Sequence, residues 1–498
     1  MKSFAKRTLT CLNRRLLSNT RVREGFGSFH SRDIEDLVAD DALNETPPSM
    51  RMLEETIDPL HSDIVQNLQF GKNARDHLFQ LDPEWTFLNH GAFGAVLEPL
   101  MFASHFWRME CEKQPLKFFD RDLFSLVAYS LRNVASFLNC PATELYPLQN
   151  VTSGLNIVLQ SLHLQPGDEV ICFSLTYGST KKMLKDKCER TGATLRIVEL
   201  PLPITSAEAI VTSLENALCS KTKLVIIDQI TSNTAMALPM LEMARAARAA
   251  GALVVVDAAH AMMSQPVSIY PTTRANSPLA PSTTHNTTTP IAHSLNTVNS
   301  LCIAEVADVW LTNGHKWLSA PKGCAFMWVH PALAGHFRPA IVSHGFQSYQ
   351  GSATRNRSTS TNDTELYARD YSQLQWWHGQ SSSGVVTHRD QVPGSKLLSA
   401  LVWDGCRDYT SLLCVPIALA LWQAIPATAA ASTTSAAPLG ASNTASSSTG
   451  MEACRTYIKQ LLHGQVVPYL MEEWRLQEED FAAPRHMREN VPMVLVSL

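Results

Sequence analysis

The sequence predicts an α/β fold in which helices cover a mostly parallel sheet. Short apolar segments rich in β-branched residues are typical of buried strands, as at 168–174 (DEVICFS), 223–228 (KLVIID) and 252–260 (ALVVVDAAH). Helical patterns lie between them, at 153–164 and at 240–251, where a glycine closes an Ala/Arg/Glu helix. Strands that alternate with helices indicate a parallel sheet with helices on both faces.

Composition and charge exclude several classes of protein. The chain has 498 residues, 45% of them hydrophobic, and a formal net charge of −4 without a basic stripe, which argues against general nucleic-acid binding. No run of 18 apolar residues suggests a membrane span, and the nearest candidate, 414–431, is expected to be a buried helix that runs into a linker. The 11 cysteines include no C-x-x-C pair, so we expect reduced thiols and no metal site.

The first residues differ from the rest of the chain. Seven Lys and Arg residues precede the first acid, Glu24, with apolar residues interspersed. This pattern is typical of a mitochondrial transit peptide, and a disordered basic tail of a cytoplasmic protein is the alternative. We expect residues 1–40 to be one or the other.

Three segments of biased composition look like surface insertions. Residues 271–300 are rich in Thr, Ser, Pro and Asn, residues 350–395 are polar and irregular, and residues 427–450 are of low complexity. They cannot bury enough apolar surface to offset their chain entropy, so we expect disordered loops. The remaining chain then divides into a large domain at 41–425, a linker at 426–450 and a partial small domain at 451–498.

Polar residues that follow the predicted strands are the candidates for a site, because parallel sheets bind ligands at the carboxyl ends of their strands. Asp257 ends one strand, where it can pair with a cationic ring nitrogen or cap the next helix. His260 can be a ligand or a structural histidine. Lys316 follows the strand-like stretch ADVWLTNGH in an apolar neighbourhood, where it can form a Schiff base or pass Trp317 to the surface.

Two further motifs add hydroxyl groups at strand ends. Thr152, Ser153 and Gly154 start a helix, where they can cap it or bind an anion such as phosphate. Thr231 and its neighbours form a polar turn. A lysine, a phosphate cradle and an acid against a pyridinium nitrogen are together what pyridoxal phosphate requires. The combination therefore favours that cofactor.

These motifs resemble the class V aminotransferases, pyridoxal-phosphate enzymes of fold type I, and most closely the isopenicillin N epimerase-like branch. The resemblance spans residues 80–425 and rests on FLNHGAFG (87–94), NVTSGLNIVLQSL (150–162), LTYG (175–178), ITSNTAMALPM (230–240), VVVDAAHA (254–261), NGHKWLSAPKG (313–323) and WDGCRDYTSLLCVPIALALW (403–422).

The resemblance implies a role for each candidate residue. Lys316 would form the aldimine with pyridoxal phosphate and move the α-proton of an amino-acid substrate, with Asp257 on the pyridine nitrogen and His260 near the phenolic oxygen. Further cofactor contacts are implied for Thr152, Ser153, Gly154, His315, Thr231, Ser232, Asn233 and Cys406. The resemblance also implies a homodimer with shared active sites, in which substrate contacts come from Asn89, His90, Tyr177 and Arg407.

Departures from the family pattern limit what is implied. Ala92 replaces a family residue in NHGSFG, and Cys406 replaces a threonine that would reach the phosphate. Residues 491–498 look like the first strand of a smaller C-terminal α/β lobe that we expect to be truncated, so no arginine can be assigned to the substrate carboxylate.

The leading function is carbon–sulfur lyase or epimerase chemistry on an amino acid. Of the two, Tyr177 favours a lyase slightly. A cysteine desulfurase, with Cys324 or Cys406 as the mobile nucleophile, is a second possibility. A catalytically inactive homologue that acts as a binding partner is a third.

Overall fold

The computed structural model describes residues 33–40, 45–271, 301–346, 396–426, 428–429, 450–489 and 491. The expected transit peptide lies almost wholly outside these residues, and so do nearly all of the three expected insertions. The positions of Lys316 and of every other candidate site residue lie inside them.

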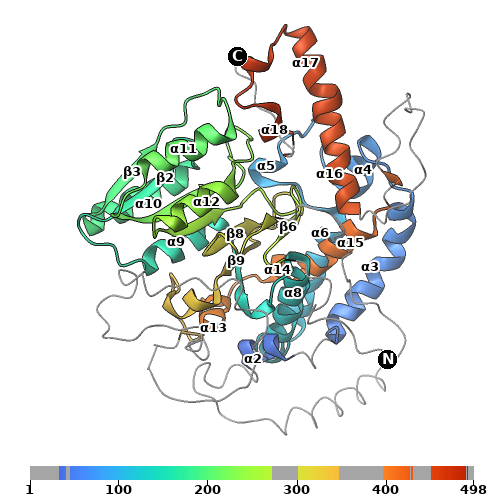
Figure 1. Ribbon diagram of the computed structural model, residues 1–498. Helices are drawn as coiled ribbons and strands as arrows, with labels where there is room; N and C mark the ends of the chain where they lie inside the picture. The colour runs from blue at the N-terminus through green and yellow to red at the C-terminus, as the bar shows by residue number, and fades with distance from the viewer. Residues whose placement is uncertain are drawn as a thin grey trace, which may run out of the picture.

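The main sheet has seven strands (Figure 1). Its strands, in spatial order, are β1 (Leu145–Leu148), β9 (Ala325–Val329), β8 (Val309–Asn313), β5 (Leu253–Asp257), β4 (Thr222–Asp228), β2 (Glu169–Phe173) and β3 (Thr194–Val198). Neighbouring strands from β8 to β3 are parallel, whereas β9 is antiparallel to both of its neighbours. The predicted α/β class with a mostly parallel sheet is confirmed. Two short strands, β6 (Val267–Ser268) and β7 (Leu301–Cys302), pair separately.

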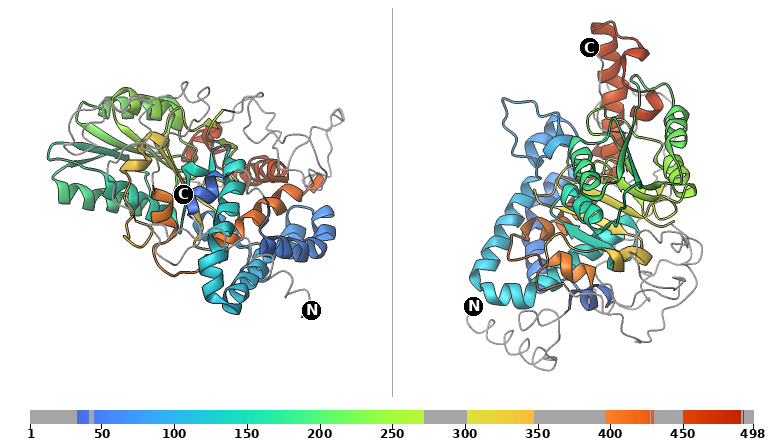
Figure 2. Two further views of the ribbon diagram at one scale, coloured as in Figure 1. Left: turned by 90° about the horizontal axis from the view of Figure 1, so that it is seen from below. Right: turned by 90° about the vertical axis from the view of Figure 1, so that its left-hand side faces the viewer.

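Helices surround this sheet. The α-helices are α2 (Ile34–Ala39), α3 (Pro48–Gln66), α4 (Lys72–Leu78), α5 (His90–Phe93), α6 (Glu98–Lys113), α7 (Pro115–Lys117), α8 (Leu123–Leu138), α9 (Val151–Ser161), α10 (Gly178–Thr191), α11 (Ala207–Ala217), α12 (Met240–Ala249), α13 (Leu397–Val402), α14 (Thr410–Leu413), α15 (Val415–Ala424), α16 (Gly450–Leu461), α17 (Val467–Glu473) and α18 (Arg485–Arg488). Helices α9 and α10 pack together, as do α11 and α12, and the two pairs flank the strands in Figure 2.

The predicted element boundaries hold to within a few residues. The strand expected at 223–228 is β4, and the helix expected at 240–251 is α12, whose last residue is Ala249. Gly251 lies just past the cap residue Ala250 with φ +83°, the left-handed conformation that glycine adopts without strain. The apolar segment that begins at residue 414 forms the buried helix α15, as expected.

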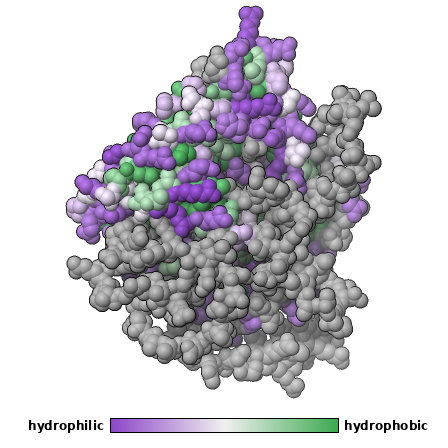
Figure 3. Space-filling model, viewed as in Figure 1, coloured by the Kyte–Doolittle hydropathy of each residue, from purple (hydrophilic) through white to green (hydrophobic). Residues whose placement is uncertain are grey.

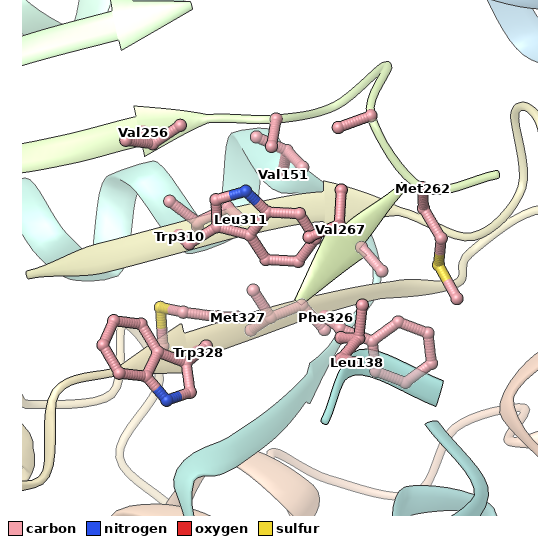
Figure 4. Packing of buried hydrophobic residues seen from close by; sticks show 14 of the residues in the cluster. Leu138, Val151, Val256, Met262, Val267, Trp310, Leu311, Phe326, Met327 and Trp328 are labelled. Carbon is pink, nitrogen blue, oxygen red and sulfur yellow. The ribbon is translucent and has the colours of Figure 1, made fainter. Parts of the chain in front are cut away.

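Strands β8 and β9 carry part of the buried core, which Figure 4 shows from close by. Trp310 and Trp328 are fully buried there, and each indole N–H finds an acceptor, on Gln229 at 2.9 Å and on Glu144 at 2.9 Å. Buried tryptophans generally need such a partner, so these two bonds fix the packing of the sheet centre.

The C-terminal part of the described chain is helical. Helices α16 and α17, joined by a π-helical turn at Leu462–Val466, form an arm at one end of the molecule in Figure 1. The strand expected at 491–498 lies outside the described residues except for Val491. On the described part of the face in Figure 3, hydrophilic residues predominate and apolar ones form small groups. No helix in the described ranges is long and apolar enough to cross a membrane.

Candidate active site

The carboxyl ends of three neighbouring strands bring the candidate residues together. β4 ends at Asp228, β5 at Asp257 and β8 at Asn313, three residues before Lys316. The side chain of Asn313 accepts the N–H of Val151 at 3.2 Å, which ties the start of helix α9 to the end of β8. The predicted cradle, acid and lysine therefore meet at one edge of the sheet.

Lys316 and His260 are in direct contact. The Lys316 Nζ atom lies 3.0 Å from His260 Nε2, and the indole N–H of Trp317 donates to His260 Nδ1 at 3.4 Å. His260 is buried, and burial, reinforced by the neighbouring lysine, lowers its pKa to about 3. Burial also lowers the pKa of Lys316, although the charge of Asp257 opposes that shift. Both groups are thus biased towards their neutral forms.

Asp257 is a buried carboxyl group aimed at the same place. Its Oδ1 accepts the backbone N–H of Ala259 at 3.1 Å, within a turn that follows β5, where the sequence left open a role as the cap of a helix. Burial raises its pKa, and the Ala259 N–H and Lys316 oppose the rise. The interaction with Lys316 places the carboxylate within electrostatic reach of the amine, so the bond to Ala259 and cofactor binding are compatible.

The start of helix α9 is capped more fully than the sequence suggested. Asn150 is the N-cap, and its Oδ1 accepts both the backbone N–H and the hydroxyl of Ser153, at 2.8 and 3.1 Å. A Cβ on Gly154 would lie 2.3 Å from the Leu311 side chain, so this glycine allows the helix to approach β8 closely. The half-buried Thr152 and Ser153 side chains lie at the first turn, where the helix dipole favours an anion.

His315 and the turn after β4 border this edge. His315 Nδ1 lies 2.9 Å from the Cys324 carbonyl oxygen, to which it donates in the neutral form. Burial lowers its pKa, which favours the neutral ring with Nε2 as an acceptor. In the turn, the buried hydroxyl of Thr231 bonds to Thr234 and to the Met236 N–H, at 2.7 and 2.9 Å. The hydroxyl of Thr231 is therefore used to shape the turn.

Ser232 and Asn233 are more accessible than Thr231. Ser232 is half-buried and Asn233 is exposed at the tip of the same turn. Of the three residues that the sequence assigned to the border of the cofactor, these two have the accessible side chains.

The N-terminal segment packs over the lysine loop. Asn89 caps α5, and the His90 ring stacks near Trp317 with ring centroids 6.2 Å apart. Lys322 donates to the Gly94 carbonyl oxygen at 2.8 Å, and a Cβ on Gly94 would lie 2.1 Å from the His315 carbonyl oxygen. Asn89 and His90 both lie in this segment, and the substrate contacts expected of them remain predictions.

Tyr177 lies at the same edge. Its backbone N–H donates to Asp228 Oδ1 at 3.3 Å, and the Thr176 hydroxyl donates to Asp228 Oδ2 at 2.8 Å. The tyrosine side chain is 44% exposed, so its hydroxyl is available to a ligand.

Cys406 and Arg407 lie in a different place. Cys406 is exposed, Arg407 pairs with Asp404 at 2.9 Å, and Asp408 of the same loop pairs with Arg108 on α6. This loop runs along α6, and no described contact joins Cys406 or Arg407 to Lys316. The roles expected of Cys406 and Arg407 at the active site remain predictions.

Sequence reasoning missed several residues of the edge. Asp228 ends β4 just as Asp257 ends β5, so the same positional argument would have found it. Asn150 stands directly before a helix, a position that favours Asn. The bond of Trp317 to His260 had no signal, because it joins two loops that are distant in sequence.

Comparisons with known proteins agree with the resemblance. Residues 120–272 match the model of the class-V aminotransferase family, a range that includes Asp257 and His260 and ends before Lys316. An isopenicillin N epimerase of Amycolatopsis lactamdurans is 28% identical over 294 residues, 58% of this chain and 65% of that protein. A probable chloroplastic L-cysteine desulfhydrase of Arabidopsis thaliana is 24% identical over 55% of this chain and 53% of that protein. The chain thus spans about half to two thirds of these relatives, and the predicted family resemblance is confirmed.

Solved structures with a similar fold include a cystine C–S lyase in complex with cysteine persulfide, at a TM-score of 0.46 and 18% identity over 67% of this chain and 71% of that chain. A cysteine desulfurase of Escherichia coli has a TM-score of 0.48 and 13% identity over 81% of this chain and 77% of that chain.

Proposed function

We propose that this chain is a pyridoxal-phosphate-dependent enzyme that acts on an amino acid by carbon–sulfur lyase or epimerase chemistry. The observation that carries the proposal is the Lys316 amine, 3.0 Å from the buried His260 at the strand ends where Asp257 and helix α9 meet. Relatives named isopenicillin N epimerase and L-cysteine desulfhydrase support the two chemistries.

The residues present fit this cofactor. Lys316 is a partly buried amine whose pKa is lowered by burial, so it can hold an aldehyde carbon covalently. Asp257 is a buried carboxyl group at the end of β5, suited to a ring nitrogen. The first turn of α9, with Thr152 and Ser153, suits a phosphate. Pyridoxal phosphate supplies an electron-accepting ring that makes the α-proton of an amino acid removable.

The chain's own groups would then move protons. Lys316 Nζ accepts the α-proton of the substrate, for which a free amine is required. In a lyase, the carbon–sulfur bond breaks with its electron pair on sulfur, and the exposed Tyr177 hydroxyl can protonate the leaving thiolate. Hydrolysis of the unsaturated three-carbon remainder of the amino acid then gives pyruvate and ammonium. In an epimerase, the proton returns to the opposite face of the α-carbon.

Spectroscopy and mapping test the cofactor assignment. Protein purified with pyridoxal phosphate should be yellow, and Lys316→Ala should be colourless. Borohydride reduction followed by peptide mapping should place the cofactor on Lys316, with the neighbouring Lys322 as the internal control. A wild-type preparation that the cofactor cannot colour would leave an inactive homologue with a binding role as the better description.

Product analysis separates the chemistries. A lyase releases pyruvate from L-cysteine, cystine or cysteine conjugates, whereas an epimerase changes the optical activity of its substrate and incorporates deuterium from heavy water at the α-carbon. Exchange without pyruvate would favour epimerisation. Tyr177→Phe should reduce pyruvate release more than α-proton exchange if the tyrosine serves the leaving group.

A cysteine desulfurase is the second candidate. It needs an accessible thiol after Lys316, and among the described cysteines beyond that lysine only Cys406 is exposed. Burial raises the pKa of the Cys324 thiol, so this residue is a poor nucleophile. Persulfide trapping with L-cysteine as substrate, compared with a Cys406→Ser variant, tests this function.

A homodimer remains part of the proposal. Three large apolar side chains on α6, Met101, Phe102 and Met109, are 43 to 52% exposed. The loop that carries Cys406 and Arg407 runs along the same helix. Analytical ultracentrifugation should give a dimer, and mixing inactive Lys316→Ala and Arg407→Ala proteins should restore activity if sites are shared.

A mitochondrial location for the full chain is also part of the proposal. It rests on the basic residues before Glu24. A fluorescent fusion of the full chain should co-localise with mitochondria, and removal of residues 1–32 should leave it in the cytoplasm.

A further inference from the structure

The contact between Trp317 and His260 decides which nitrogen of the imidazole carries its proton. An indole N–H can only donate, so His260 Nδ1, at 3.4 Å from Trp317 Nε1, must present its lone pair. Neutral imidazole has one N–H, which then belongs to Nε2. The ring is neutral at ordinary pH, because burial lowers the pKa of His260 to about 3.

The state of the lysine follows from the state of the histidine. His260 Nε2–H points at Lys316 Nζ, 3.0 Å away. An ammonium group has three donors and no acceptor, whereas a free amine has a lone pair. A charged Lys316 would place two donors against each other, so the contact is a hydrogen bond only when the lysine accepts it as a free amine.

We propose that Trp317 is a positioning residue that holds Lys316 in its free-amine form, because its indole N–H fixes the imidazole proton of His260 on Nε2. The free amine is the form that condenses with an aldehyde. This proposal deepens the proposed function. It rests on that function only for the statement that the Lys316 amine reacts with the aldehyde of a cofactor. The tautomer and the state of the lysine are properties of the unloaded protein.

The indole is itself held in place from the other side. The His90 ring is roughly parallel to that of Trp317, at 29° and with centroids 6.2 Å apart. His90 Nδ1 accepts the N–H of Ala95 at 3.4 Å, and burial, with help from Lys322, lowers the pKa of His90 to about 4. The N-terminal segment therefore presents a neutral ring to Trp317, which keeps the indole N–H aimed at His260.

Other ionisable groups lie around Lys316 and His260, and none of them outweighs the effects that favour a neutral Lys316. On β5, Asp257 interacts with Lys316 and favours its charged form, but burial is the larger effect. His315, next to the lysine, is biased towards neutrality by burial. The Lys322 amine donates to the Gly94 carbonyl oxygen. The hydrogen bond from His260 favours the neutral amine of Lys316, as burial does, and opposes the effect of the Asp257 charge.

The test uses the full chain without cofactor and does not depend on activity. Proton–nitrogen correlation spectra of protein with isotope-labelled histidine report the tautomer, and His260→Gln assigns the signal. We expect the neutral Nε2–H form in the wild type. The pH dependence of acylation at Lys316, followed by peptide mass spectrometry, reports the pKa of its amine, which we expect well below that of an exposed lysine.

Trp317→Phe keeps an aromatic ring beside His90 and removes the N–H donor together with the rest of the five-membered ring, and the control below removes the same atoms elsewhere. Trp317→Phe should let His260 populate the Nδ1–H form and raise the apparent pKa of Lys316 by about one unit, so that acylation at a fixed neutral pH slows about tenfold. The matched control is Trp107→Phe on α6, which removes a buried indole N–H that has no hydrogen-bond partner among the described residues. It should leave both measurements unchanged.

Specific outcomes would overturn the inference. An Nδ1–H tautomer in the wild type contradicts it without any variant, which protects the test from a variant that fails to fold. If Trp317→Phe has the same His260 tautomer and the same apparent pKa of Lys316 as the wild type, the proposal is also contradicted. The proposed function is tested separately by colour and by the mapped cofactor adduct, so it can stand when this inference fails.

Discussion

Asp228 and Asp257 are paired in the register of β4 and β5, so two buried carboxyl groups end neighbouring strands at the edge of the candidate site. Burial, reinforced by the charge of Asp257, raises the pKa of Asp228 to about 7. Burial raises the pKa of Asp257 as well, but the Ala259 N–H that its Oδ1 accepts favours the ionised form. The pair therefore keeps one proton at mildly acidic pH, and Asp228 is the member that the structure favours as its carrier.

Asp228→Asn should flatten the pH dependence of stability. The carboxyl group has a pKa of 3.8 when unfolded and about 7 when folded. Its contribution to stability is therefore present in full below 3.8 and is lost as the pH rises to about 7. Over that window, the unfolding free energy of the wild type should fall relative to that of the variant, by up to about 1.4 kcal/mol per pH unit. Urea unfolding across the window measures the difference, and parallel curves would show that Asp228 ionises normally.

Thr176→Val should destabilise the protein by about 1–3 kcal/mol, because it removes a hydroxyl that donates to Asp228 and accepts the N–H of Phe173. The loss of the bond to Asp228 should also raise the pKa of that carboxyl group further. Thr176→Ser keeps the hydroxyl and is the control, with an expected cost of about 1 kcal/mol or less. Equal effects of the two substitutions in urea unfolding would mean that the methyl group matters and the hydrogen bonds do not.

The sequence predicted the sheet because its buried strands are short, β-branched and flanked by helices, as β4 and β5 show. It predicted Lys316 and Asp257 because strand ends are where ligands bind in such sheets. It could not predict the bond from Trp317 to His260, nor the close approach of Gly94 to the His315 carbonyl oxygen. Both depend on how loops from distant parts of the chain approach each other, and periodicity carries no signal for that.

Gly94→Ala should be far more destabilising than Gly251→Ala. Both glycines have positive φ, +69° and +83°, so each substitution strains the backbone, and Gly94, with ψ 158°, lies in a region that is essentially restricted to glycine. At Gly94 the new Cβ would also lie 2.1 Å from the His315 carbonyl oxygen, whereas no described atom lies within 4 Å of a Cβ at Gly251. The N-terminal segment must then move off the lysine loop.

Limited proteolysis and urea unfolding measure that difference. We expect Gly94→Ala to cost at least about 2 kcal/mol more than Gly251→Ala and to expose residues 89–94 to proteases. In the same protein, the loss of the ring contact between His90 and Trp317 should raise the apparent pKa of Lys316. If the two alanine variants are equally stable, the segment does not rest on the lysine loop as described.

Gly154→Ala should destabilise the protein even though alanine is the better helix former by about 1 kcal/mol. The new Cβ would lie 2.3 Å from the Leu311 side chain and 2.5 Å from that of Leu148, so α9 would be pushed away from β8. We expect a cost of about 1–3 kcal/mol from overpacking. Leu311→Ala removes the closer of the two obstacles and should itself cost about 2–5 kcal/mol.

The double variant decides whether this contact is the cause. Since Leu311→Ala opens the space that the Gly154→Ala methyl group needs, the combined cost should be smaller than the sum of the two single costs, by about 0.5–3 kcal/mol. Urea unfolding of the four proteins gives the coupling energy. Additive costs would mean that Gly154 is required for another reason, such as access of an anion to the first turn of α9. In that case, Gly154→Ala should bind inorganic phosphate more weakly than the wild type.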